Sequence, residues 1–208
     1  MRDRYRSPYR VTIGGGQPER VMEVKHLFAL DDWSPDGRWL LYHFSTSTLQ
    51  PAIQAIRLDQ LSDSPVTVAT ALTGSVDQAV MSADGRWVAY NSTESGGSEV
   101  FVVPFPPTGD RWQVSINGGA QPIWRQDGRE LFYLALDGTI MAAPIRTSPA
   151  FEAGQAVALF RLPIPTILFG LEQYAVAPDG TRFLYPAATG NLSAPPLTVL
   201  ANWQSLLQ

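Results

Sequence analysis

The sequence predicts an all-β protein made of repeated units, and three observations support this prediction. A short phrase built around an Asp-Gly pair, with a tyrosine six residues after each Asp, occurs four times. The four aspartates are 48, 43 and 52 residues apart. Between them lie short apolar or alternating runs separated by Gly, Pro, Ser and Asn, which is the pattern of strands joined by turns. Units of this length with four short strands each are typical of β-propeller blades.

Each repeated phrase is first of all a tight turn. Gly tolerates a positive φ and Asp bonds to its own backbone, so an Asp-Gly pair between apolar runs predicts a β-hairpin. We therefore assign a structural role to the turn residues of the repeat. They are Asp36, Gly37, Asp84, Gly85, Asp127, Gly128, Asp179 and Gly180.

The strand after each turn is predicted to be buried on both faces. Residues 39–42 and 131–134 are apolar without interruption, whereas a half-exposed strand alternates. Two further runs follow in each repeat, one continuous and one shorter and half-polar. The continuous runs are residues 53–58, 100–105, 140–145 and 197–203, and the half-polar runs are residues 66–70, 111–116 and 156–160. Together with the segment before the turn they give four strands per blade, and the half-polar run fits the outer edge.

The chain is predicted to contain an N-terminal segment followed by four blades. The boundaries are residues 1–26 for the N-terminal tail and strand, and about residues 27–72, 73–117, 118–162 and 163–208 for the blades. Within the N-terminal segment, residues 9–13 have the sequence of an outer strand and resemble residues 112–116. Two arrangements remain open. This strand completes the fourth blade and closes a small ring, or the chain is an arc of a larger, six-bladed propeller.

Composition narrows the classes of function. With 208 residues, 45% of them hydrophobic, the chain is long enough to bury a core. A net charge of −4 argues against a nucleic-acid partner, because such proteins carry a basic face. The absence of cysteine rules out disulfides and thiolate metal sites. The sequence contains neither an apolar run long enough for a membrane segment nor the h-region of a signal peptide, which leaves the compartment open.

The sequence offers no catalytic motif, and we expect no enzyme activity and no cofactor. A serine hydrolase of the elbow type requires G-x-S-x-G with a partner histidine, and the elbow is missing. We expect structural roles for both histidines, His26 and His43. No metal site is predicted either.

Two groups of residues invite a functional interpretation that we set aside. Asp31, Asp32 and Asp36 are close in sequence and carry calcium-type oxygen ligands, but their spacing fits no EF-hand, so solvated turn and loop positions are favoured. Four tryptophans recur at repeat positions, which favours packing between blades over ligand stacking. They are Trp33, Trp39, Trp87 and Trp124.

The repeated phrase resembles the TolB-type WD40-like β-propeller repeat, whose mark is S-P-D-G followed by apolar residues and an aromatic residue. The closest likeness is to propellers at the C-terminal end of bacterial serine/threonine protein kinases. Residues 111–133, 174–184 and 197–203 carry this resemblance. The resemblance implies a six-bladed parent protein, an extracytoplasmic location and a kinase domain outside this chain. The sequence of this chain contains none of the kinase motifs.

These observations predict a non-catalytic recognition or sensor module that binds a protein or peptide. Its contacts are expected on the longer connections, because rigid blades hold loops in fixed places. These connections are residues 45–50, 91–97, 106–110 and 162–170. Within the last, the apolar candidates for partner contact are Leu162, Ile164, Ile167, Leu168 and Phe169. The alternatives are a gate of a prolyl-oligopeptidase-like peptidase and a TolB-like envelope scaffold, and open blade edges would also permit self-association.

Overall fold

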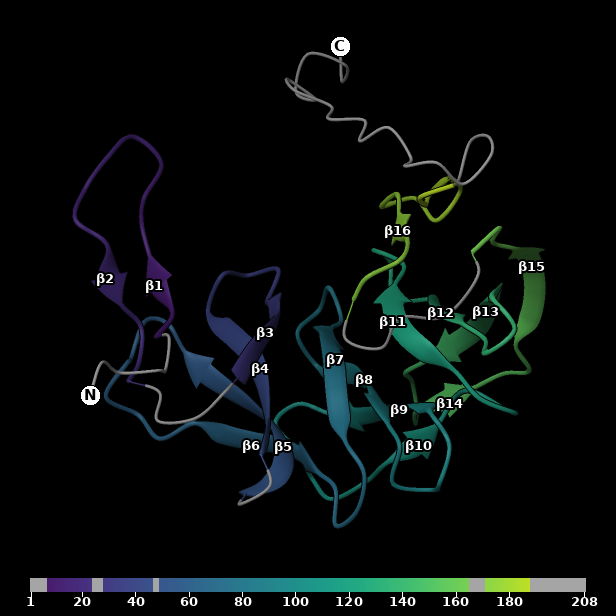
Figure 1. The fold of residues 1–208 in the computed structure, drawn as a ribbon, viewed down its shortest axis with the longest axis horizontal. Coiled ribbons are helices and arrows are strands. Elements are labelled where there is room, and N and C mark those ends of the chain that lie inside the picture. Colours follow the sequence, from purple (N-terminus) through teal and green to yellow (C-terminus); the bar gives the residue numbers. More distant parts are fainter. Residues whose placement is uncertain (1–6, 24–27, 47–48, 165–170, 188–208) are drawn as a thin grey trace, which may run out of the picture.

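The structure, a computed structural model, describes residues 7–23, 28–46, 49–164 and 171–187 and is an all-β arc of antiparallel sheets (Figure 1). The arc runs from a short N-terminal hairpin through three blades to a second hairpin at its other end. Within these residues, no helix is long and apolar enough to cross a membrane. The predicted all-β propeller is therefore confirmed, and it takes the form of an open arc.

Each blade is a meander in which consecutive strands pair with one another. The first blade contains β3 (Phe28–Trp33), β4 (Trp39–Thr46), β5 (Leu49–Arg57) and β6 (Val66–Thr70). The second contains β7 (Val76–Met81), β8 (Trp87–Ser92), β9 (Glu99–Pro104) and β10 (Trp112–Gln113). The third contains β11 (Ala120–Trp124), β12 (Glu130–Leu134), β13 (Thr139–Arg146) and β15 (Val157–Arg161), and the short β14 (Glu152–Ala153) pairs with the end of β13.

The Asp-Gly pairs lie in the turns between the first and second strands of the repeats. In the second blade, the Ser82 hydroxyl donates to Asp84 Oδ1 over 2.7 Å, and the Arg86 backbone N–H donates to the same oxygen over 3.1 Å. Gly85 follows with φ of 69°, in the left-handed region that glycine adopts readily. The side chain of the aspartate thus holds the turn closed, as an Asx-type turn does.

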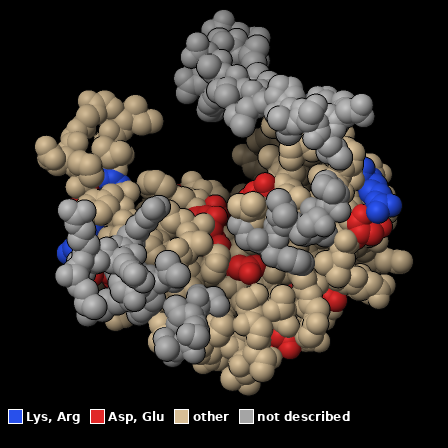
Figure 2. Space-filling view, in the orientation of Figure 1, with Lys and Arg blue, Asp and Glu red and all other residues tan. Residues whose placement is uncertain are grey.

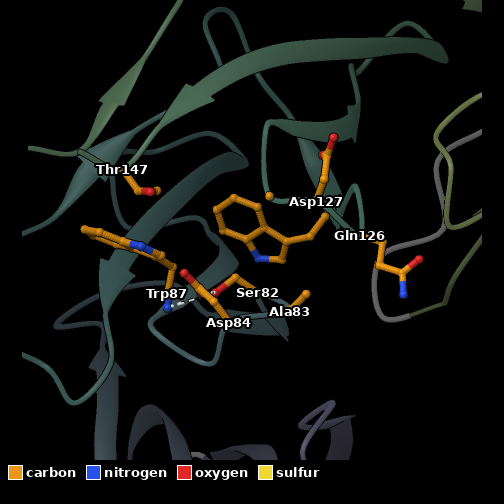
Figure 3. Close-up of a pocket in the computed structure, with 9 residues that line it drawn as sticks. Ser82, Ala83, Asp84, Trp87, Gln126, Asp127 and Thr147 are labelled. Carbon is orange, nitrogen blue, oxygen red and sulfur yellow. Dashed lines mark hydrogen bonds between the residues drawn. The ribbon is translucent and has the colours of Figure 1, made fainter. Parts of the chain in front are cut away.

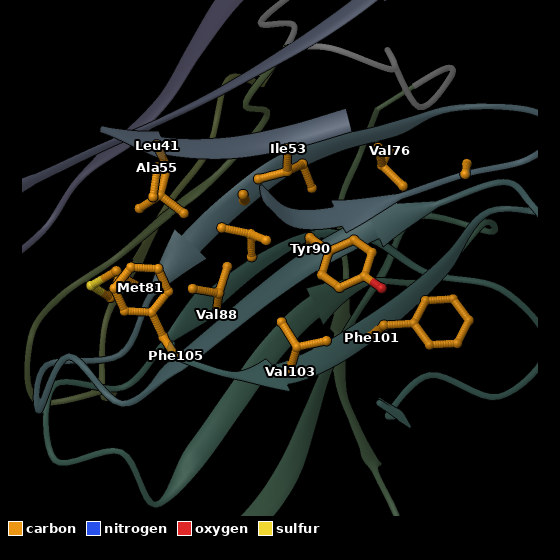
Figure 4. Close-up of a cluster of buried hydrophobic side chains, with 13 residues drawn as sticks. Leu41, Ile53, Ala55, Val76, Met81, Val88, Tyr90, Phe101, Val103 and Phe105 are labelled. Carbon is orange, nitrogen blue, oxygen red and sulfur yellow. The ribbon is translucent and has the colours of Figure 1, made fainter. Parts of the chain in front are cut away.

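The core consists of apolar layers between neighbouring blades. Figure 4 shows the layer in which Leu41 and Ile53 of the first blade face Val88 and Tyr90 of the second. All four side chains are buried, with at most 1% of their surface exposed. A corresponding cluster joins the second and third blades, and another joins the third blade to the C-terminal hairpin. The strands predicted to be covered on both faces are therefore covered on both faces, β12 by a sheet on either side and β4 by the second blade on one side and by the N-terminal segment on the other.

The N-terminal segment covers the free face of the first blade. Val21 is buried against Leu40 and Tyr42, and the Arg10 guanidinium donates to the Leu58 carbonyl. Within this segment β1 (Tyr9–Arg10) pairs with β2 (Glu19–Arg20). In the described residues the N-terminal strand β1 pairs with β2 and not with a strand of the fourth repeat, which agrees with an open arc.

The fourth repeat is described only in part. Its strands β16 (Ala175–Val176) and β17 (Phe183–Leu184) form a hairpin that packs on the third blade through Tyr174 and Phe183. The remainder of the predicted fourth blade, residues 188–208, lies outside the described residues.

Buried glutamines connect successive blades near the axis. The Gln121 backbone N–H donates to Gln78 Oε1 of the preceding blade over 3.1 Å. The Gln121 side chain in turn accepts from the Gln173 N–H over 2.8 Å and donates to Gln173 Oε1 over 3.1 Å. Gln121 is fully buried, so these bonds form away from water, where losing one is costly.

We expect the Gln121→Leu variant to lose about 2–4 kcal/mol of unfolding free energy, because two hydrogen bonds between blades disappear from a buried site. Urea unfolding followed by circular dichroism measures this loss. Gln60→Leu is the matched control, since Gln60 is exposed, and a change within about 0.5 kcal/mol is expected there. Equal stability of the two variants would contradict a bridging role for Gln121.

Candidate functional site

The first strands of the blades, β3, β7 and β11, lie side by side around the axis of the arc (Figure 1). Each of them contains a β-bulge near the same level: the pairing registers shift between Leu30 and Asp32, between Asp77 and Val80, and between Ala120 and Ile123. Gln78 and Gln121, with φ of 54° and 55°, lie in these bulges. Because a bulge re-aims the side chains beside it, polar residues are directed inward where the blades meet.

The Asp31 side chain is the most buried carboxylate at this level. Asp31 Oδ1 lies 2.7 Å from His43 Nδ1, and only 3% of the Asp31 side chain is exposed. Its other oxygen, Oδ2, has no hydrogen-bond partner. Burial raises the pKa of Asp31 above its ordinary value, although the hydrogen bond and charge of His43 oppose this change. A buried carboxylate with an unfilled acceptor position is a candidate contact for a ligand donor.

The pKa of His43 is raised as well. Burial alone would lower the pKa of the imidazole, but the hydrogen bond and charge of Asp31, together with the charge of Asp77, outweigh burial. His43 therefore carries a proton more readily than an isolated histidine, and the Asp31 contact fixes its ring.

Two further carboxylates complete what we call the axial acidic cluster, defined as Asp31, Asp77 and Glu172. Asp77 Oδ1 accepts from the Asn91 side-chain amide over 2.7 Å. Glu172 is exposed, yet surrounding protein reduces its hydration and raises its pKa, and the charges of Asp31 and Asp77 raise it further. In Figure 2, acidic side chains gather near the middle of this face and the basic ones lie towards its flanks.

The cluster creates a negative potential at the axis. Like charges held within electrostatic reach destabilise one another, so a positive group arriving between them is stabilised. Within the described ranges, no three His, Cys, Asp or Glu residues are arranged to hold a metal ion. The carboxylates instead come from three different repeats, which suits a ligand large enough to span them.

The predicted contact loops fall at both ends of the strands. Three of these loops lie at the end of the strands that carries the axial acidic cluster, because they follow β4, β8 and β15, which run towards that end. They are residues 91–97 and the described parts of residues 45–50 and 162–170. Residues 106–110 lie at the opposite end, near the Asp-Gly turns.

The apolar candidates for partner contact are only partly described. Leu162 is 3% exposed and packs with Phe132 and Tyr174, and Ile164 packs against the same cluster. These two side chains therefore belong to the core between the third and fourth repeats. Ile167, Leu168 and Phe169 lie outside the described residues, as does His26.

Several other expectations need correction. Asp31 and Asp32 are not solvated loop residues, because both belong to β3, and Asp32 Oδ2 accepts from the Met81 N–H of the next blade over 2.8 Å. Trp33 was expected to pack between blades but is 55% exposed. It occupies the side of the first blade on which a preceding blade would pack.

The glutamines were missed by the sequence analysis, although the repeat contains a signal for them. Gln78, Gln121 and Gln173 each lie six residues before the Asp of an Asp-Gly pair. In the first repeat this position is Leu30, and the next residue, Asp31, occupies the bulge. An acidic residue precedes two of these glutamines, which gives Asp77 and Glu172.

Comparisons with known proteins support the fold. No family model and no curated protein matches this chain. Among solved structures, a protein assigned as TolB from Agrobacterium tumefaciens matches with a TM-score of 0.54 at 18% identity, covering 74% of this chain and 58% of that one. The tricorn protease matches with a TM-score of 0.53 at 12% identity, over 76% of this chain and 20% of that one. A protein of unknown function from Desulfotomaculum acetoxidans DSM 771 matches with a TM-score of 0.54 at 14% identity, over 93% and 62%.

The class of protein defined by these blades is the β-propeller. Among β-propellers, the fold of this chain is TolB-like. At these identities the likeness establishes the fold alone, and the chain spans less than two thirds of each of the three matched structures.

The stability of the protein is expected to fall as pH rises through the neutral range. The folded state holds the His43 proton more tightly than the unfolded chain, so this contribution is complete below the ordinary value of 6.5 and is lost as pH rises through the raised folded pKa. The pKa of Asp31 is also raised, so its titration likewise lowers the stability of the folded state as pH rises above 3.8, the ordinary pKa of an aspartate. Melting temperatures measured between about pH 5 and 8 test this expectation. The His43→Gln variant should lose the slope above about pH 6, and an unchanged slope would refute the role of His43.

Proposed function

We propose that the chain is a non-catalytic recognition module that binds a protein or peptide at the axial acidic cluster, with a lysine or arginine side chain of the partner entering between the carboxylates. The observation that carries this proposal is the buried Asp31 carboxylate, whose Oδ2 lacks a hydrogen-bond partner in the structure. A buried acceptor favours a donor, and the charges of Asp77 and Glu172 favour a positively charged one. Ammonium and guanidinium groups supply both properties.

A peptide is favoured over a free small cation because the carboxylates of the site are spread over several repeats. Asp31, Asp77 and Glu172 come from three repeats, so a ligand that contacts all of them spans the axis. The loop of residues 91–97 lies at the same end of the blades and offers backbone and hydroxyl groups around it. The rigid sheets hold these groups in place, which is how propellers present binding loops.

The proposal also covers the compartment of the protein and its role in the cell. The resemblance of the repeated phrase to TolB-type and kinase-linked propellers favours a sensor or scaffold role outside the cytoplasm. The TolB-like fold supports the scaffold part of this proposal.

A peptidase gate is the second candidate function, favoured by the fold likeness to the tricorn protease. His43 is bonded to Asp31 in the structure, as the base of a catalytic triad is bonded to its acid, but its position in β4 faces the axial acidic cluster. We therefore assign the pair to ligand binding, and a hydrolase domain elsewhere in a longer parent would be needed for the gate.

A fluorescein-labelled peptide of alternating Gly and Lys is expected to bind, and its Gly-Glu counterpart is not. Replacing Glu172 by Gln should weaken binding of the lysine peptide by about threefold to tenfold, because one of three converging charges is removed. Fluorescence anisotropy at low and high salt measures this change, and binding should weaken as salt screens the charges.

The control for this experiment is Asp63→Asn, which removes one negative charge at an exposed position in the loop between β5 and β6. Binding by this variant should match that of the unmodified protein. Equal loss in both variants would indicate a general charge effect, and no preference for the lysine peptide would overturn the proposal.

A further inference from the structure

A pocket of about 310 Å³ lies between the second and third blades, at the end of the strands that carries the Asp-Gly turns (Figure 3). One wall comes from the second blade, with Ser82, Asp84 and Trp87, and the other from the third blade, with Trp124 and Thr147. The axial acidic cluster lies at the opposite end of the inner strands, so the two sites are separate. The volume is at the small end of the roughly 300–1,000 Å³ typical of ligand pockets.

The two indole rings of the pocket are held in fixed positions. Trp87 packs against Trp112 and Phe151, with ring centroids 5.8 and 4.8 Å away. Trp124 donates from its indole N–H to the Val80 carbonyl of the second blade over 3.2 Å. Preorganised aromatic walls lose little conformational entropy when a ligand binds, which makes them effective binding surfaces.

The repeat architecture does not require an indole at the position of Trp124. The equivalent residue, three before the Asp of the turn, is Met81 in the second repeat and Val176 in the fourth. Met81 is 5% exposed and belongs to the core between the first two blades. At this position the two neighbouring junctions therefore have an aliphatic side chain, whereas this junction has an indole ring.

The charges at the pocket are already paired. Arg86 Nε lies 2.8 Å from Asp84 Oδ2, and Arg125 Nε lies 3.5 Å from Asp127 Oδ2, the other carboxylate of the lining. A cationic ligand would have to compete with these arginines for the carboxylates. The remaining acceptor positions of the carboxylates suit neutral hydroxyl groups, and the Thr147 hydroxyl adds a group that both donates and accepts.

We propose that this pocket binds a neutral carbohydrate, with a pyranose ring stacked on the tryptophan walls and its hydroxyl groups donating to Asp84 and Asp127. The face of a pyranose presents C–H groups that pack on the electron-rich face of an indole. The sugar hydroxyl groups can donate hydrogen bonds to the carboxylates at the rim of the pocket, although the sugar carries no net charge. The site thus matches a small, flat, hydroxyl-bearing ring in size, in shape and in polarity.

Isothermal titration with N-acetylglucosamine and with methyl β-D-glucopyranoside tests this proposal, with the shift of tryptophan fluorescence as a second readout. At least one sugar is expected to bind saturably, with a dissociation constant on the order of 1 mM. The Asp84→Asn variant should weaken binding at least tenfold. Its matched control is Asp36→Asn, because Asp36 makes the same turn contacts with Ser34 and Arg38 but does not line the pocket.

The Trp124→Met variant provides a second test, since Met81 shows that methionine fits the equivalent position of the repeat. It should abolish measurable sugar binding while keeping the circular dichroism spectrum of the unmodified protein. Absence of saturation by both sugars at about 50 mM would overturn the proposal. So would equal loss in the Asp84 and Asp36 variants, or binding of acetyl-lysine amide in place of the sugars.

Discussion

The fold depends on strands that are apolar on both faces. Leu41, Val88 and Leu131 are each fully buried, and each belongs to the second strand of its blade. A sheet with such strands is stable only when another layer covers each face, so every blade needs a neighbour on either side. Radial stacking meets this requirement for the second and third blades. In the described part of the chain, Val21 of the N-terminal segment covers the outer face of the first blade in place of another blade.

The same stacking creates the polar axis. Packing the blades brings their first strands together, and a bulge in each strand directs a polar side chain towards the junction. Where that side chain is glutamine, it bonds to the next blade and stabilises the arc. Where it is Asp31, its Oδ1 bonds to His43 of its own blade, the Gln78 backbone N–H also stabilises the carboxylate, and the buried Oδ2 has no hydrogen-bond partner. The bonds between blades and the candidate binding site thus come from adjacent positions of the same bulged segment of the repeat.

The turns and strands were predictable because their causes are local. An Asp-Gly pair bonds within a few residues, and the apolar runs are read directly from the sequence. The pairing of Asp31 with His43 joins residues 12 apart, and that of Gln121 with Gln173 joins residues 52 apart, so neither follows from a local pattern. Trp33 was misjudged for a related reason. The position of Trp33 in the repeat predicts contact with a preceding blade, but in the described part of the chain no blade precedes the first blade, and Trp33 is exposed. The pocket at Trp124 likewise depends on the distance between two sheets.

The segment that carries Val21 has a consequence for cooperativity. In a linear stack of units, each unit is stabilised by its nearest neighbours, and opening begins at the ends. Among the described residues, the first blade packs against the second blade on one face, and on the other face it has a thin cover held by Val21 and the Arg10 contact with the Leu58 carbonyl. The second blade has a sheet on both sides. Backbone amides should therefore exchange with solvent fastest at the two hairpins, more slowly in the first blade and slowest in the second, so that the arc melts from its ends inward.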